Sequence, residues 1–80
     1  MIKIPNDSIK LLENCLEAHA PELITLLNDT TINYTPEIYN KFRSAIGDEL
    51  ALKGFNETWE PNEYGLKLEA LIDEIGRLFL

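Results

Sequence analysis

Apolar residues recur every three or four positions along nearly the whole of this 80-residue chain. That spacing places them on one face of an α-helix, whereas a half-buried strand would alternate apolar and polar residues. Alternation is confined to Ile2 and Ile4, a stretch too short to predict a strand. The pattern therefore predicts an all-α fold. Because 80 residues provide one modest core, we expect a single helical domain over residues 1–80.

The clearest predicted helix is Pro36–Lys53. Thr35 supplies a hydroxyl for the N-cap, Pro36 suits the first helical position, and Glu37 lies near the positive end of the helix dipole. Gly54 follows the last helical residue, as is typical of a helix C-terminus.

Two further helices are expected before it. The first is Asp7–Ala18, and its N-cap candidates are Asn6, Asp7 and Ser8. Ala20 and Pro21 end that helix, and Pro21 suits the first turn of a second, short helix that stops near Asn28.

The last predicted helix follows a loop over residues 55–61, and Asn62 is its N-cap candidate. Its apolar stripe is wide enough to predict that it packs between two other helices. The stripe consists of Tyr64, Leu68, Leu71, Ile72, Ile75 and Phe79, widened by Leu66, Ala70 and Leu78. We therefore expect a compact bundle of three longer helices and one short helix.

The charge of the chain restricts its partners. Fourteen acidic residues against seven basic ones give a net charge of −7 and an isoelectric point near 4.5. Nucleic acids and anionic membrane surfaces both recruit Lys and Arg, so we expect neither as a partner. The sequence shows neither the apolar core of a signal peptide nor a membrane-spanning run, and a cytoplasmic location is expected.

Reactive residues are scarce. A lone cysteine, Cys15, and a lone histidine, His19, exclude an internal disulfide, a thiolate metal cluster and a histidine pair for a metal. Their spacing would suit a nucleophile and its base, but Cys15 lies in an apolar run. We interpret Cys15 as a buried apolar residue and His19 as a surface residue at a helix end. When Gly54 or Gly65 is aligned with the glycine of a calcium-binding EF-hand loop, the residues at the ligand positions do not match.

Asp7-Ser8-Ile9 resembles the triplet to which acyl carrier proteins attach phosphopantetheine. Carriers place a whole helix before that triplet, whereas six residues precede it here, and a helix cap explains the same residues. This chain lacks the residues that a carrier or a small hydrolase requires. We therefore expect no enzymatic activity, no cofactor and no metal.

The remaining signal is an acidic, aromatic region. Residues 48–74 contain eight acids and two lysines, and residues 55–64 interleave three aromatics with three glutamates. Aromatic anchors flanked by charge are typical of tight protein interfaces, although the aromatics would equally serve to fill the core. A smaller group, Glu13, Glu17 and Glu22, is interpreted as an ordinary helix face. The candidate partner-binding residues are Asp48, Glu49, Phe55, Glu57, Trp59, Glu60, Glu63 and Tyr64.

Three stretches of the C-terminal half carry a family resemblance: residues 45–50 (AIGDEL), 54–56 (GFN) and 60–73 (EPNEYGLKLEALID). They resemble small bacterial immunity proteins that accompany polymorphic toxins, including those of contact-dependent growth inhibition. In size and acidity the chain is also similar to the four-helix immunity proteins of nuclease colicins. It lacks the adjacent tyrosines of their third helix, so none of their binding residues is transferred.

The resemblance implies a protein that binds and neutralises a cognate toxin, expected to be a basic nuclease, by occluding its active site or substrate groove. An acidic adaptor or regulatory module that binds another basic protein is the alternative. The sequence leaves open whether the protein is a monomer or a homodimer, and whether it would cover the active site or a remote site.

Overall fold

The computed structural model describes residues 4–28 and 35–78, and every regular element within them is helical. Helix α1 (Asn6–His19) is followed by a 3₁₀ turn (Pro21–Leu23) that continues into the short α2 (Ile24–Asn28). Two long helices, α3 (Pro36–Lys53) and α4 (Glu63–Arg77), complete the fold. The predicted all-α bundle of three longer helices and one short helix is confirmed.

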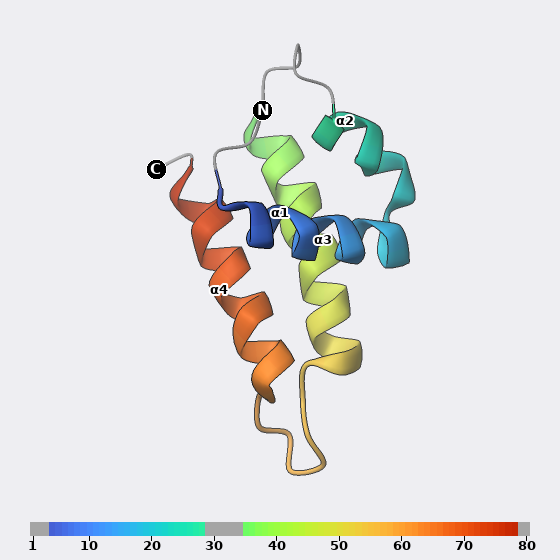
Figure 1. Cartoon of the computed structure of the whole chain (residues 1–80). Helices are drawn as coiled ribbons and strands as arrows, with labels where there is room; N and C mark the ends of the chain where they lie inside the picture. The colour runs from blue at the N-terminus through green and yellow to red at the C-terminus, as the bar shows by residue number, and fades with distance from the viewer. Residues whose placement is uncertain (1–3, 29–34, 79–80) are drawn as a thin grey trace.

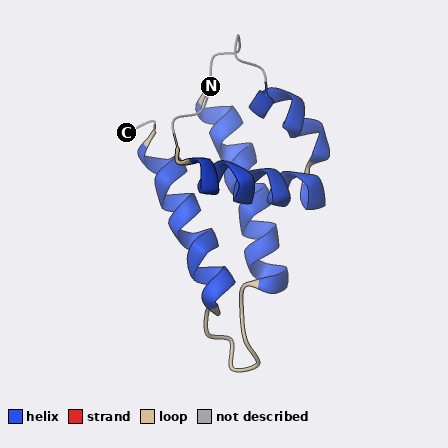
Figure 2. Ribbon diagram, in the orientation of Figure 1, coloured by secondary structure: helices blue, strands red, loops and turns tan. Residues whose placement is uncertain are grey.

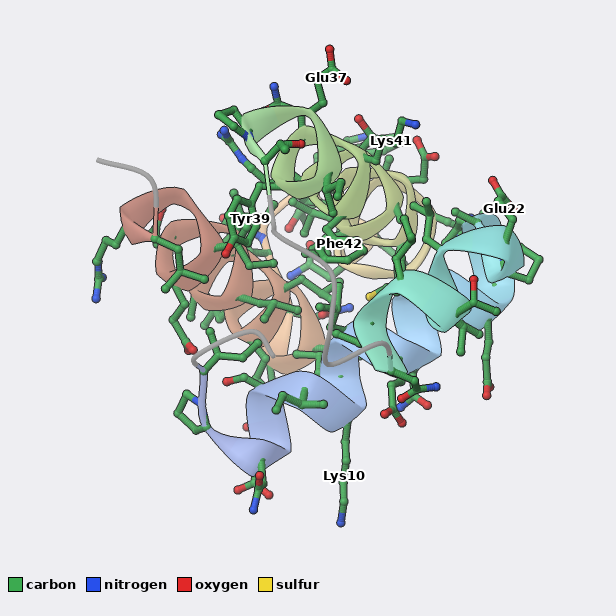
Figure 3. The ribbon with its side chains drawn as sticks, turned by 90° about the horizontal axis from the view of Figure 1, so that it is seen from above. Lys10, Glu22, Glu37, Tyr39, Lys41 and Phe42 are labelled. Atoms are coloured by element: carbon green, nitrogen blue, oxygen red, sulfur yellow. The ribbon has the colours of Figure 1, made fainter. Side chains whose placement is uncertain are left out.

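Helices α3 and α4 form an antiparallel hairpin, and α1 crosses it on one side (Figure 1). Seen from above, α1 and α2 lie on the same side of the hairpin (Figure 3). The ribbon in Figure 2 shows that α1 crosses the upper half of the hairpin and that its lower half projects beyond α1. We call the end of the hairpin that contains this projecting part, residues 50–69, the arm. The molecule is accordingly elongated, with extents of 43 × 25 × 21 Å.

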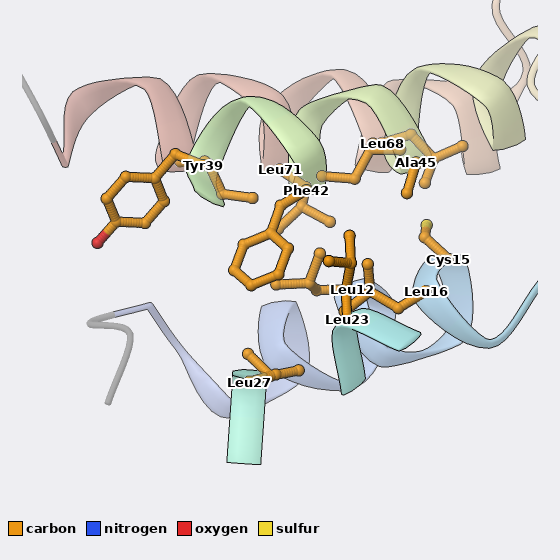
Figure 4. Close-up of a cluster of buried hydrophobic side chains, with 12 residues drawn as sticks. Leu12, Cys15, Leu16, Leu23, Leu27, Tyr39, Phe42, Ala45, Leu68 and Leu71 are labelled. Carbon is orange, nitrogen blue, oxygen red and sulfur yellow. The ribbon is translucent and has the colours of Figure 1, made fainter. Parts of the chain in front are cut away.

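The core lies where α1 and α2 meet the hairpin. Phe42 from α3 is fully buried among leucines of the other helices (Figure 4). Cys15 is also fully buried, which confirms its interpretation as a small apolar core residue. The core contains Leu12, Cys15, Leu16, Leu23, Leu27, Tyr39, Phe42, Ala45, Ile46, Leu68, Leu71 and Ile75.

The helix ends follow the capping rules in two of the three long helices. Thr35 Oγ1 accepts a hydrogen bond from the backbone N–H of Ile38 at 3.4 Å, and the bounds Pro36–Lys53 agree with the prediction. Asn62 Oδ1 likewise accepts from the N–H of Gly65 at 2.7 Å and caps α4, as predicted. Helix α1 differs, because Pro5 is its N-cap and no side chain caps it. The predicted capping role of Asn6, Asp7 or Ser8 is therefore wrong.

Helix α4 packs mainly along α3 and meets α1 over a shorter stretch. Its buried stripe is narrower than the sequence suggests, because Leu66 and Ala70 are exposed to solvent. Phe79, which the sequence places in that stripe, lies outside the described residues. None of the helices formed by residues 4–28 and 35–78 has both the length and the apolar character needed to cross a bilayer.

Candidate protein-binding surface

Asn56 orders the loop that connects α3 to α4. Its Oδ1 accepts hydrogen bonds from the N–H of Thr58 at 3.0 Å, from the hydroxyl of Thr58 at 2.7 Å and from the N–H of Glu60 at 3.1 Å. Its backbone N–H donates to the carbonyl of Glu60 at 2.9 Å, and its carbonyl accepts from the N–H of Trp59 at 3.0 Å. Five hydrogen bonds on one residue give this short loop a defined conformation.

Trp59 lies in this loop with an unusual backbone conformation and an exposed side chain. Its φ of 64° is in the left-handed region, where it is alone among the non-glycine residues that the structure describes. Its side chain is 80% exposed, and its ring lies 6.4 Å from that of the half-buried Phe55. A left-handed backbone costs an L-amino acid about 1 kcal/mol or more. The loop therefore holds a large aromatic side chain in solvent at a conformational cost.

The base of the loop is pinned where α3 ends and α4 begins. The N–H of Asn62 donates to the carbonyl of Gly54 at 2.9 Å, and its side-chain amide donates to the carbonyl of Lys53 at 2.9 Å. Gly65 approaches the same point so closely that a Cβ atom on it would fall 2.1 Å from the carbonyl oxygen of Gly54. The two helix ends are thus in backbone contact, which fixes the direction of the loop.

The arm also carries exposed apolar and acidic side chains. Leu52, Trp59 and Leu66 are the large apolar residues that are exposed within residues 4–28 and 35–78, and all three belong to the arm. Four of the predicted acidic contacts are exposed: Asp48, just before the arm, and Glu57, Glu60 and Glu63 within it. Most of the predicted binding residues are therefore on the surface of one end of the molecule.

Glu49 and Tyr64 are placed differently from the prediction. The Glu49 side chain is 5% exposed, and its Oε2 accepts a hydrogen bond from the hydroxyl of Tyr64 at 2.6 Å. Its Oε1 lies 2.9 Å from Nε2 of His19. These contacts connect α1, α3 and α4 inside the protein, so neither Glu49 nor the Tyr64 hydroxyl is a surface contact for a partner. His19 is 17% exposed and is not the surface residue that the sequence suggested.

The hydrogen bonds around Glu49 favour its charged form. The Tyr64 hydroxyl contributes most to holding the pKa of Glu49 below its ordinary value of 4.5, with help from His19 and Lys53, while burial acts in the opposite direction. Burial and the neighbouring carboxylate raise the pKa of Tyr64. Burial and the same carboxylate raise the pKa of Cys15 to about 11, so this thiol stays protonated at neutral pH and is a poor nucleophile.

The sequence did contain a signal for this buried group. Glu49 follows Ala45 by four positions and Ile46 by three, which places it on the core face of α3. A carboxylate on a core face needs hydrogen-bond donors. His19 and Tyr64, each at the polar margin of an apolar stripe, are such donors. Pairing them with Glu49 required knowing how α1 crosses the hairpin.

Within the part of the chain that the structure describes, no three His, Cys, Asp or Glu side chains are placed to hold a metal ion together. Comparisons with protein-family models, with curated proteins and with solved structures find no match to this chain. The functional assignment therefore depends on the surface of the molecule itself.

Proposed function

We propose that this protein is an immunity protein that binds a basic protein toxin and neutralises it, with the loop end of the arm as the principal contact. The observation that carries the proposal concerns Trp59 in the ordered loop. Its side chain is 80% exposed, and its backbone has a left-handed conformation. Tryptophan is enriched among the residues that dominate protein interfaces. Backbone strain is characteristic of functional sites.

The order of the loop has an energetic consequence for binding. Burying a large aromatic side chain against a partner contributes on the order of 2 kcal/mol or more. Because Asn56 already fixes the loop, little of that gain is lost to ordering the backbone when the complex forms. The exposed side chains of Leu52 and Leu66 supply further apolar area on the same arm.

The acids of the arm indicate the chemistry of the partner. Glu57, Glu60 and Glu63 surround Trp59 in the sequence and are all exposed. A nuclease must bind a phosphate backbone, so its substrate groove carries Lys and Arg. Carboxylates on the arm would take the contacts that phosphates make and would accelerate encounter by electrostatic attraction. The family resemblance of residues 45–73 supports the same class of partner.

The test is co-expression with the product of the neighbouring upstream gene, scored by cell survival and by co-purification. We expect that the neighbour alone is toxic, that survival requires this protein, and that a one-to-one complex is recovered. A harmless neighbour that does not co-purify would contradict the immunity function. An acidic adaptor for another basic protein would then be the better interpretation.

Charge-reversal variants locate the contact. We expect that the triple variant Glu57→Lys, Glu60→Lys and Glu63→Lys loses toxin binding while its helical circular dichroism is unchanged. The matched control makes the same change in charge on the opposite part of the molecule, at Glu13→Lys, Glu17→Lys and Glu22→Lys. Loss of binding in the control but not in the first variant would move the interface to α1 and the 3₁₀ turn.

A substitution at Trp59 separates the aromatic contact from the charge. Asparagine adopts the left-handed conformation more readily than other non-glycine residues, so Trp59→Asn keeps the loop while removing the indole. We expect unchanged thermal stability and at least about a tenfold loss of toxin affinity, mainly through faster dissociation. Unchanged affinity in this variant would mean that the exposed indole is not a binding anchor.

A further inference from the structure

The side of α4 opposite its buried residues carries an exposed leucine. Leu66 is 56% exposed, and Ala70, which follows it by four positions and so lies one turn further along the same side, is also exposed. The exposed residues that border them on this side are acidic: Glu63, Glu69 and Asp73. We call these five residues the outer face of α4. They extend over about 15 Å of the helix and begin at the end of the α3–α4 loop.

The charges of the outer face have no basic partner within the described part of the protein. Glu69 and Asp73 are four positions apart, a spacing at which like charges on a helix repel each other. In residues 4–28 and 35–78, none of the three acids of this face forms an ion pair. Lys67 lies about 100° around the helix from Leu66 and lines the hollow between α4 and α1. Arg77 follows Asp73 by a full turn, at the end of α4. The outer face is therefore acidic along its whole length.

The other exposed leucine of the arm has different surroundings. Leu52 is 69% exposed near the end of α3. The exposed charged residues closest to it in the sequence are Asp48 and Lys53, which have opposite signs. Surroundings of mixed charge do not select a basic partner over an acidic one, whereas the outer face of α4 does. The two exposed leucines are therefore not equivalent, and the outer face of α4 is the better defined surface.

We propose that the outer face of α4 binds an amphipathic helix of the toxin, with Leu66 against the apolar stripe of that helix and the three acids paired with lysine or arginine along its border. Charge complementarity selects the basic partner. A helix packed alongside α4 presents side chains at every turn, which matches the spacing of Leu66 and Ala70, and the small Ala70 permits a close approach.

A second copy of this chain is a poor occupant of the same surface, because two outer faces would place identical acids against each other. That the basic helix belongs to the toxin rests on the proposed function, but the chemistry of the face does not. The inference extends the contact from the α3–α4 loop along α4 to Asp73, which lies about 15 Å from the start of that helix.

The first experiment uses the isolated protein and a synthetic probe. The probe is a helical peptide of leucine and lysine that carries its leucines on one face. It is titrated into the ¹⁵N-labelled protein at about 150 mM NaCl, where attraction between distant charges is screened, and amide chemical shifts are followed. We expect saturable shifts that are largest at Leu66, Ala70 and Asp73. Shifts confined to residues 55–61 or to α1 would overturn the inference, because the peptide would then bind elsewhere.

A matched pair of leucine variants tests the apolar contact. Leu66→Ala removes the exposed side chain, and we expect about a tenfold weaker affinity for the peptide, because a leucine that the peptide covers is lost. Leu52→Ala makes the same change at the exposed leucine of α3 and should bind the peptide like the unmodified protein. Neither variant should lose thermal stability, because both side chains are mostly exposed. Equal affinity of the two variants for the peptide would overturn the inference.

A matched pair of double variants tests the charges. Glu69→Gln with Asp73→Asn neutralises two acids of the outer face, and we expect at least about a threefold weaker affinity for the peptide. Glu13→Gln with Glu17→Gln neutralises two acids with the same spacing on α1 and should have little effect. An equal loss in both double variants would overturn the inference, because it would show attraction to the net charge of the protein rather than to this face.

The outcomes for the outer face and for the proposed function are separable. If binding of the peptide depends on Leu66 but the neighbouring gene product is harmless, the proposed function fails and the site for a basic helix stands. If the toxin is neutralised and Leu66→Ala binds it as tightly as the unmodified protein does, the proposed function stands and the assignment of the outer face to the toxin is overturned.

Discussion

At the scale of single residues, the most consequential group is the buried carboxylate of Glu49. It accepts hydrogen bonds from Tyr64 and lies within hydrogen-bonding distance of His19, and so it links α4 and α1 to α3. A buried charge is tolerated only when it is paired and hydrogen-bonded. Removing one of its donors should therefore cost more than the hydrogen bond itself contributes, because the charge remains buried.

We predict that Tyr64→Phe lowers the free energy of unfolding by about 1–3 kcal/mol at pH 7. The pKa of Glu49 is lowered in the folded protein, so its contribution is complete above pH 4.5 and is lost as the pH falls from 4.5 through the folded-state pKa. Tyr64→Phe lacks the hydroxyl that contributes most to lowering the pKa of Glu49. Its stability should therefore fall less steeply below pH 4.5, and the two curves should converge.

Urea unfolding of the unmodified protein and of Tyr64→Phe, at intervals between pH 7 and pH 3, measures this difference. A constant gap over the whole range would contradict the prediction, because it would show that the hydroxyl stabilises the protein independently of the charge on Glu49.

At the scale of elements, the helices were predictable and their contacts were less so. The bounds of α3 follow from Thr35, Pro36 and Gly54, which act within one or two turns of the chain. The exposure of Leu66 was missed because the width of an apolar stripe does not say how much of it a neighbour covers. The absence of a side-chain cap on α1 was missed because Pro5 can begin a helix without one.

The contact between Gly54 and Gly65 leads to a prediction about the hairpin. A Cβ atom on Gly65 would fall 2.1 Å from the carbonyl oxygen of Gly54, a backbone atom that cannot rotate away. We expect Gly65→Ala to lower the free energy of unfolding by about 1–3 kcal/mol, because the helix ends must separate.

Gly76→Ala is the matched control, since Gly76 also lies within α4 and a Cβ atom there would meet nothing within 4 Å apart from its chain neighbours and the backbone of its own helix. It should raise the free energy of unfolding by about 0.5–1 kcal/mol, because alanine favours the helix over glycine. Urea unfolding of both variants checks the pair. Stabilisation by both substitutions would show that the two glycine backbones are not in close contact.

At the scale of the whole molecule, the all-α fold and the acidic end were predictable, since periodicity and charge are local properties of the sequence. The sequence did not predict that Glu49 and Tyr64 are separated from Trp59 and from the three exposed glutamates. This separation depends on how α1 crosses the hairpin, which brings His19 to Glu49 beside the partly buried Tyr64 and leaves the loop with Trp59 in solvent.

Glu57, Glu60 and Glu63 are exposed and no basic residue lies between them, so they should make complex formation sensitive to salt. If the partner is the proposed basic toxin, we predict that its association rate falls at least tenfold between about 50 mM and 500 mM NaCl, while the dissociation rate changes much less. Stopped-flow mixing over this range measures both rates. An association rate that does not depend on salt would mean that the acids of the arm do not guide the encounter.

The position of Trp59 also gives the protein an optical property. It is the only tryptophan of the chain, and its indole is already surrounded by water in the folded state. Its fluorescence emission maximum should therefore change little when the protein unfolds, but should move to shorter wavelength when a partner covers the ring. In this molecule, intrinsic fluorescence reports on association rather than on folding.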